Sequence, residues 1–133
     1  MLILAAALSV ASAQEALPDL HAPRRPAVEC AEHVRDDDAR RDCLEDLLDN
    51  AEGGLAAAIA AAHDEAAEID ADFPGFANAT DRLNAAHAAW FAYRDAECAR
   101  RASLLLMGED GEELALDCRI ALTRARAAEL LDN

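Results

Sequence analysis

Four cysteines in a chain of only 133 residues restrict the fold of this protein more than any other feature of its sequence. Cys30, Cys43, Cys98 and Cys118 form an even set, and two disulfides are the usual state of such a set in an exported protein. Free buried thiols are the alternative, since a reduced cysteine packs as a small apolar residue. Neither the first nor the second pair has the short Cys-x-x-Cys spacing of a zinc site. The sequence therefore predicts two disulfides and no metal site.

The N-terminal residues indicate export, which is the condition under which disulfides persist. Residues 2–10 form an uncharged apolar run that ends before Ala11-Ser12-Ala13, a small-x-small sequence that signal peptidase accepts. The run is shorter than the about 20 residues that a membrane-spanning helix needs. We therefore expect residues 1–13 to be a bacterial signal peptide. The mature protein should be periplasmic or secreted, with no membrane insertion after cleavage.

The remaining chain divides into a leader and one helical domain. Three prolines and the lack of an apolar period predict a flexible leader over residues 14–27, followed by a domain over residues 28–133. In the domain, apolar residues recur at spacings of three, four and seven, and no stretch alternates with period two. The fold class is therefore all-α: a small antiparallel bundle of about three main helices plus a short N-terminal helix, stapled by two disulfides.

The apolar period also predicts the helix limits and the inward faces. The three long helices should cover about 39–70, about 80–105 and about 112–131, with a turn from Gly108 to Gly111. Gly53-Gly54 permits a bend in the first helix, although the apolar stripe keeps its phase across the pair. Asn78 or Thr80 should cap the second helix. The expected inward residues are Leu83, Ala86, Trp90, Tyr93 or Arg94, and Cys98 on the second helix, and Leu114, Cys118, Leu122 and Ala125 on the third.

The disulfide pairing follows from the predicted turns. Cys98 and Cys118 lie equally far from Gly108, so an antiparallel helix pair that turns there places them level with each other. A straight helix would hold Cys30 and Cys43 about 20 Å apart, whereas a disulfide needs Cα atoms within about 7 Å. Their pairing thus requires a chain reversal near Asp37, within three aspartates that favour helix caps. We predict Cys30–Cys43 and Cys98–Cys118.

The charge of this chain is strongly acidic and unevenly distributed. The formal net charge is −15, and residues 28–72 carry 15 acids against three arginines, a net of −12. Such a charge repels nucleic acid and anionic lipid and attracts basic proteins. A solvated, solubilising surface is the more general reading of an acidic face.

The second half of the chain contains the segment Trp90-Phe-Ala-Tyr93-Arg94-Asp95-Ala-Glu-Cys98, and Cys118 is followed by a threonine and an arginine at fixed spacing. With this combination the chain resembles the LprI-type lysozyme inhibitor family of small exported bacterial domains. His87 departs from the family pattern, which has Gln there. In the first long helix the pattern is Asp-x-x-Leu-Asn-x-x-Tyr, and the corresponding residues here are Glu52, Leu55, Ala56 and Ile59. The matching motif positions, which we expect to be mostly structural, are Leu83, Trp90, Tyr93, Arg94, Asp95, Gly108, Thr123, Arg126 and Leu130.

Physical chemistry predicts structural roles for most of these residues. Trp90 is the largest apolar side chain of its stripe, so we expect it to anchor the core. Arg94 and Arg126 should pair with carboxylates such as Glu52 or Asp95 and set the helix register. Thr123, in the middle of a helix, can bond its own backbone.

The resemblance implies lysozyme inhibition, and the acidic charge suits a basic exported partner. Glu109, Asp110, Glu112 and Glu113, in the predicted turn, are candidate partner-binding residues, although a capped and solvated turn is the simpler interpretation. The alternative function is a structural or adaptor module of the cell envelope with no enzyme target. The sequence contains no Ser-His-Asp or Cys-His arrangement and no phosphate-binding glycine loop, so we expect neither catalysis nor a cofactor.

Overall fold

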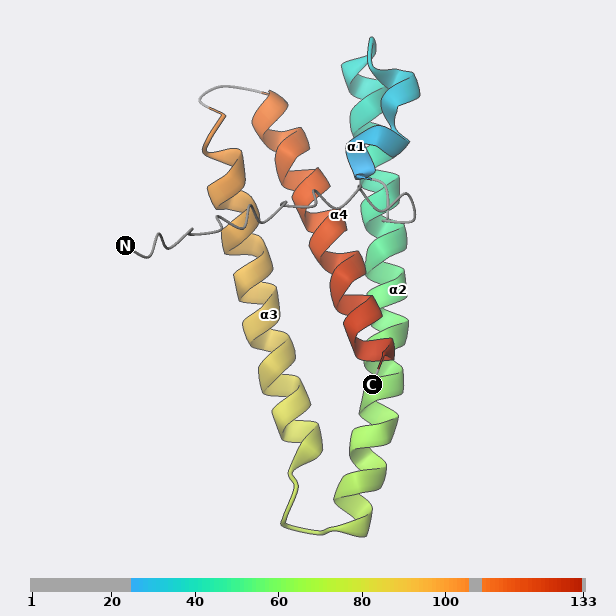
Figure 1. The fold of residues 1–133 in the computed structure, drawn as a ribbon, viewed down its shortest axis with the longest axis vertical. Helices are drawn as coiled ribbons and strands as arrows, with labels where there is room; N and C mark the ends of the chain where they lie inside the picture. The colour runs from blue at the N-terminus through green and yellow to red at the C-terminus, as the bar shows by residue number, and fades with distance from the viewer. Residues whose placement is uncertain (1–24, 106–108, 133) are drawn as a thin grey trace, which may run out of the picture.

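The computed structural model describes residues 25–105 and 109–132, which form helices joined by short turns (Figure 1). No β-strand occurs within these ranges. The predicted all-α bundle with a short N-terminal helix is confirmed, whereas the predicted signal peptide and Gly108 lie outside the described residues. None of the described helices is long and apolar enough to cross a membrane. The elements are α1 (Pro26–Glu29), the 3₁₀ turn η1 (Ala31–His33), α2 (Asp37–Asp72), α3 (Ala79–Ala102) and α4 (Glu109–Leu131).

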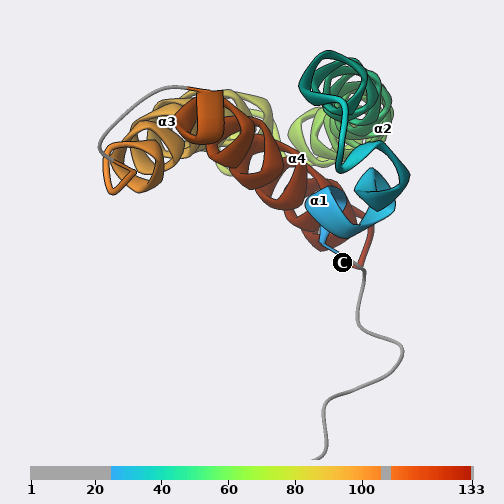
Figure 2. The ribbon, with the colours of Figure 1, turned by 90° about the horizontal axis from the view of Figure 1, so that it is seen from above.

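The three long helices form an incomplete bundle in which α4 is the central member. Helix α4 packs against both α2 and α3, and α1 lies against α4 and the start of α2 (Figures 1 and 2). Helix α4 ends well before the turn that joins α2 to α3. The distal part of the α2–α3 hairpin therefore extends beyond α4 as a pair of helices without a third.

Both predicted disulfides are confirmed. Cys30 and Cys43 have Cα atoms 6.0 Å apart, and those of Cys98 and Cys118 are 5.5 Å apart. The required reversal occurs just before α2, where Asp36 is the N-cap and its side chain accepts a hydrogen bond of 3.0 Å from the Ala39 amide. The first bridge thus ties α1 and η1 to α2, and the second ties α3 to α4.

The α2–α3 turn is closed by a residue that the sequence pattern did not single out. Asn78 is the N-cap of α3, as expected, but it has a left-handed backbone (φ 48°) and its side chain makes no capping bond. Instead, Asp70 of α2 accepts hydrogen bonds from the amides of Ala79 (2.7 Å) and Thr80 (3.0 Å). Both hydrogen bonds lower the pKa of Asp70, and the bond from the Thr80 amide has the larger effect.

Two predicted boundaries were wrong by a few residues. Helix α4 begins at Glu109, so Gly111 and the acids around it belong to its first turns rather than to a loop. Acidic residues suit this position, because the amide groups at a helix N-terminus are electropositive. Helix α1 begins at Pro26, inside the segment predicted as a leader, since proline is well tolerated at the first position of a helix. Helix α2 continues through Gly53 and Gly54 without a break.

The predicted inward face of α3 is confirmed only in part. Cys98 is fully buried and Arg94, one of the two alternatives at that level, is only 7% exposed. Tyr93 is 54% exposed, Ala86 is exposed and Trp90 is half-buried. Arg94 and Cys98 are four residues apart and share one helix face, which the disulfide turns toward α4. The expectation that Trp90 anchors the core was therefore wrong.

The core is small and is centred on α2 and α4. On α4, Cys118 is buried as predicted, but Ile120 and Thr123 are buried as well, while Leu114 and Leu122 are half-buried and Ala125 is exposed. A helix that lies between two others must bury two faces, and a single predicted stripe describes only one. The buried apolar residues are Cys30, Leu44, Ala51, Leu55, Ala58, Ala66, Cys98, Cys118 and Ile120.

Candidate functional site

A buried guanidinium is the centre of the residues that carry the family resemblance. Arg94 of α3 donates from Nη1 to Glu52 Oε1 of α2 at 3.1 Å and to Thr123 Oγ1 of α4 at 3.2 Å. Its Nε donates to Asp95 Oδ1 at 3.2 Å. The side chain of Arg94 is 8% exposed, against 48% for Glu52. The Arg94 side chain therefore joins all three long helices, through hydrogen bonds that its charge strengthens.

Aromatic rings cover the same guanidinium. Arg94 Cζ lies 4.8 Å from the ring centroid of Phe91 and 5.5 Å from that of Trp90. At this distance the face of an aromatic ring attracts a cation. Trp90 therefore contacts the central arginine from a half-buried position.

The expected pairing of the two motif arginines is confirmed for Arg94 and wrong for Arg126. Arg126 pairs with Glu129, three residues farther along α4, at 2.7 Å, so this ion pair lies within one helix and does not link two. Thr123, expected to bond its own backbone, accepts from Arg94 instead. Both outcomes depend on how the helices are rotated, which sequence spacing alone does not reveal.

The departures from the family pattern gather around one pocket. The pocket, of about 230 Å³, lies between α2 and α3. Ala56, Ile59 and His87, which differ from the pattern that this sequence resembles, are far apart in the sequence, and the fold places them around the same pocket. The lining residues are Glu52, Leu55, Ala56, Ile59, His87 and Phe91.

This environment favours the neutral form of His87. Its ring packs edge-on against Phe91, with centroids 4.5 Å apart, and Nδ1 is buried without a hydrogen-bond partner among the described residues. Burial is the main cause that lowers the pKa of His87 below its ordinary value of 6.5, and the nearby charges of Arg126, His63 and Arg94 lower it further.

The stability of the folded protein is expected to fall as His87 becomes protonated at low pH. Protonation is easier in the unfolded chain, whose His87 keeps the ordinary pKa of 6.5. The contribution of the neutral ring is therefore complete above pH 6.5 and is lost as the pH falls from there through the lowered pKa. Urea unfolding of the protein and of His87→Gln, at about pH 7.5 and about pH 5.5, measures this. Between the higher and the lower pH, the unfolding free energy of the wild type should fall by more than that of His87→Gln. An equal difference at both pH values would contradict the assignment.

The acidic segment at the start of α4 is partly engaged in contacts with α2. Glu113 accepts from Arg40 Nη2 at 2.7 Å and from Arg40 Nε at 2.8 Å, and its side chain is 16% exposed. Glu112 lies 3.1 Å from Arg41 Nη2 and is 69% exposed. The side chains of Glu109 and Asp110 lie outside what the structure describes. Sequence reasoning missed the Arg40–Glu113 pair because its members are 73 residues apart.

The exposed acids in the first half of α2 form a strongly charged surface. We call Asp38, Asp42, Glu45, Asp46 and Asp49 the acidic face, since they recur at spacings of three and four on one side of the helix. All five are exposed, and no ion pair to a described arginine or histidine involves them. This surface can attract a cationic partner without first breaking internal bonds.

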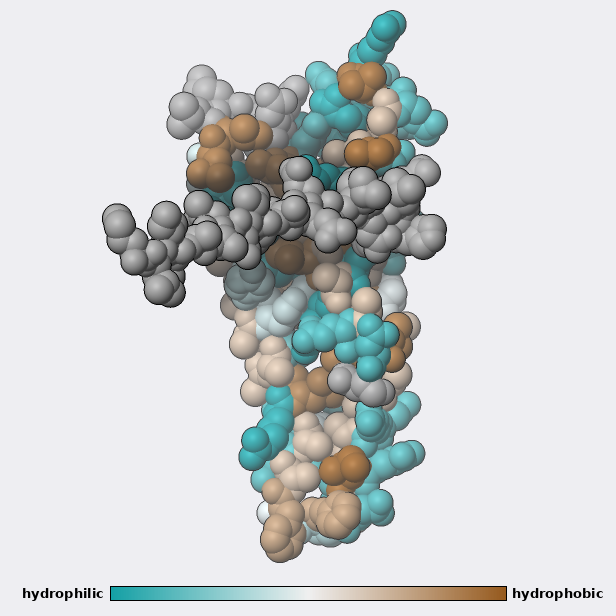
Figure 3. Space-filling model, viewed as in Figure 1, coloured by the Kyte–Doolittle hydropathy of each residue, from teal (hydrophilic) through white to brown (hydrophobic). Residues whose placement is uncertain are grey.

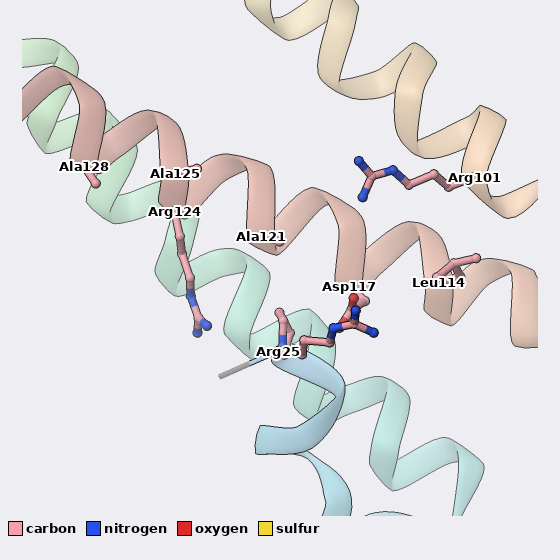
Figure 4. Close-up of a pocket in the computed structure, with 9 residues that line it drawn as sticks. Arg25, Arg101, Leu114, Asp117, Ala121, Arg124, Ala125 and Ala128 are labelled. Atoms are coloured by element: carbon pink, nitrogen blue, oxygen red, sulfur yellow. The ribbon is translucent and has the colours of Figure 1, made fainter. Parts of the chain in front are cut away.

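A second pocket, of about 510 Å³, lies on the outer side of α4 between α1 and the end of α3 (Figure 4). Its floor is apolar, and Arg101 and Arg124 extend over it from α3 and α4. Both arginines are already paired, with Glu97 and Glu29 respectively. Arg100 and Arg101 together lower the pKa of Glu97 to about 2. The charge around this pocket is thus largely compensated internally.

The described residues offer no site for a metal ion, because no three His, Cys, Asp or Glu side chains among them converge. All four cysteines are in disulfides, so none is a free nucleophile.

Comparison with known proteins gives one clear result. The model of a family described as "Lysozyme inhibitor LprI" matches residues 30–130, which include both disulfides, the Arg94 network and all but the last residue of the three long helices. No curated protein and no solved structure matches. An inhibitor family is compatible with a protein that is not an enzyme. With most of its length covered by this match, the chain belongs to the LprI family of lysozyme inhibitors.

Proposed function

We propose that this protein is exported to the periplasm or secreted, and that it binds and inhibits a lysozyme that is itself a basic protein. Family membership is the observation that carries the proposal. The acidic face supports it, because exposed carboxylates along α2 complement a cationic enzyme. The two disulfides suit an oxidising compartment outside the cytoplasm.

The mechanism that this surface supports is electrostatic steering followed by occlusion of the enzyme. A net charge of −15 raises the rate at which a basic partner is encountered. At moderate ionic strength, salt screens most of this attraction beyond a distance of about 10 Å. Steering alone does not keep a complex together, because exposed charge pairs contribute little to affinity. The acidic face should therefore govern association more than dissociation.

Inhibition should be measurable with purified proteins. Added at micromolar concentration, the protein is expected to slow lysis of a cell-wall suspension by a basic lysozyme, and more strongly at low salt than at physiological salt. No inhibition under either condition would end the proposal. A salt-resistant complex with a partner that is not an enzyme would instead indicate an envelope adaptor.

Neutralising the acidic face provides the specific test. The variant Asp42→Asn, Glu45→Gln, Asp46→Asn and Asp49→Asn is expected to fold normally, since these side chains are exposed. Its association rate should fall about tenfold at low salt and little at high salt. Surface plasmon resonance separates association from dissociation. An association rate that does not change would show that the face does not steer the enzyme.

A further inference from the structure

The distal turn of the α2–α3 hairpin exposes an unusual amount of apolar surface. Phe76 is 88% exposed, Phe73 57% and Ile69 41%. They are spaced by four and three residues, so they belong to one end of the molecule, and we call these three residues the hairpin tip. In Figure 3 apolar side chains gather at this end, beyond the reach of α4. Single exposed apolar residues are common, but a cluster of them marks a contact surface.

The hairpin tip is held in a defined shape by several bonds. The Phe76 amide donates to the Phe73 carbonyl at 3.1 Å, and the Phe73 amide donates to the Ile69 carbonyl at 3.0 Å. Gly75 takes a positive φ of 79°, which a glycine adopts without strain. Asp70 then ties the turn to the first residues of α3, as described above. A preorganised turn loses little conformational entropy when it binds.

The charge around the hairpin tip is mainly negative. Residues 60–82 contain six acids and one arginine, Arg82, whose Nε donates to the Ala77 carbonyl at 3.0 Å. We call Asp64, Glu65, Glu68 and Asp72 the tip carboxylates, and all four are exposed. An apolar projection surrounded by carboxylates is complementary to an apolar recess surrounded by basic residues. A convex tip of this kind fits a cleft better than it fits a flat surface.

We propose that the hairpin tip is the part of this protein that enters and occludes an apolar recess in a cationic enzyme. This inference rests on the proposed function and specifies which surface performs it. Phe73 and Phe76 supply the apolar contact, and the tip carboxylates face the basic rim of the recess. The acidic face, nearer the other end of α2, accelerates the encounter. Aromatic residues with large exposed areas are the side chains that most often dominate binding affinity.

The experiment compares two variants that remove equal numbers of exposed apolar side chains. Phe73→Ser with Phe76→Ser removes the tip residues. Leu104→Ser with Leu131→Ser removes residues that are 67% and 64% exposed but lie away from the hairpin tip, and serves as the control. Binding to a purified lysozyme of basic isoelectric point is followed by surface plasmon resonance, and inhibition by the lysis assay. Unfolding curves verify that both variants fold.

The tip variant is expected to dissociate about a hundredfold faster, at about tenfold for each phenylalanine, while its association rate changes little. The control should bind as the wild type does. If the wild type inhibits and the tip variant inhibits equally, the tip proposal is wrong and the proposed function stands. Equal losses in both variants would indicate non-specific apolar adhesion and would also overturn the tip. If the wild type does not bind lysozyme at all, the proposed function fails, and the tip proposal fails with it.

Discussion

Removal of each disulfide is expected to lower the free energy of unfolding by about 3 kcal/mol, the cost of releasing loops of 13 and 20 residues in the chain-entropy model. The loss of both is a large share of the 5 to 15 kcal/mol that typically stabilises a domain. Among the residues that the structure describes, nine apolar ones are buried and three of these are cysteines, so little apolar packing remains to compensate. We expect the fully reduced protein to be largely unfolded at 25 °C.

Urea unfolding monitored by circular dichroism, with and without reductant, measures this effect. The single-bridge variants Cys30→Ala with Cys43→Ala and Cys98→Ala with Cys118→Ala separate the two contributions. The first bridge holds only α1 and η1 to α2. Its loss should therefore reduce the protection of backbone amides from hydrogen exchange mainly in those short elements. The second joins two long helices, and its loss should reduce protection along most of α3. A reduced protein with an unchanged unfolding midpoint would refute the prediction.

Replacement of Arg94 by Met is expected to cost about 2 kcal/mol, a value in the range for hydrogen bonds to a charged group. The buried Thr123 hydroxyl loses its partner, and the contacts of the guanidinium with Phe91 and Trp90 are lost. Glu52 is about half exposed, so water screens its charge and keeps the cost below that of a fully buried pair.

The matched control is Arg100→Met. Arg100 binds Glu97 at 2.7 Å, but its side chain is 59% exposed, and exposed ion pairs contribute about 0 to 1 kcal/mol. Arg94→Lys retains the charge but loses the planar fork, so its stability should lie between wild type and Arg94→Met. If Arg94→Met and Arg100→Met unfold at the same urea concentration, the network around Arg94 does not hold the three helices together.

Features of the fold that depend on neighbouring residues could be predicted from the sequence. The long helices, the Asp36 cap and the reversal before α2 all follow from spacing and local side-chain chemistry. The disulfide pairing followed from the same turns, because an antiparallel pair places residues equidistant from a turn side by side. The pairing of Arg94 with Glu52 or Asp95 could be predicted because an arginine on an inward helix face of an acidic protein needs a carboxylate partner, and Arg94 pairs with both.

Features of the candidate site were less predictable. The exposure of Phe73 and Phe76 could not be foreseen, since a Phe-Pro-Gly-Phe turn is equally compatible with burial under a third helix. It became visible only because α4 ends before the turn. The pocket beside His87 likewise needed the fold, which brings together substitutions made on two different helices.

By itself the sequence determined which segments are helical, where the chain reverses, which cysteines pair and how acidic the surface is. These properties depend on caps, turns, periodicity and composition, whose effects act over a few residues or do not depend on position. Only the tertiary structure decided the rotation of α3, which buries Arg94 and leaves Trp90 half-buried, and the partners of Arg40 and Thr123. The physical reason is that the rotation of a helix depends on how its side chains pack against residues distant in sequence, and several rotations satisfy the same apolar period.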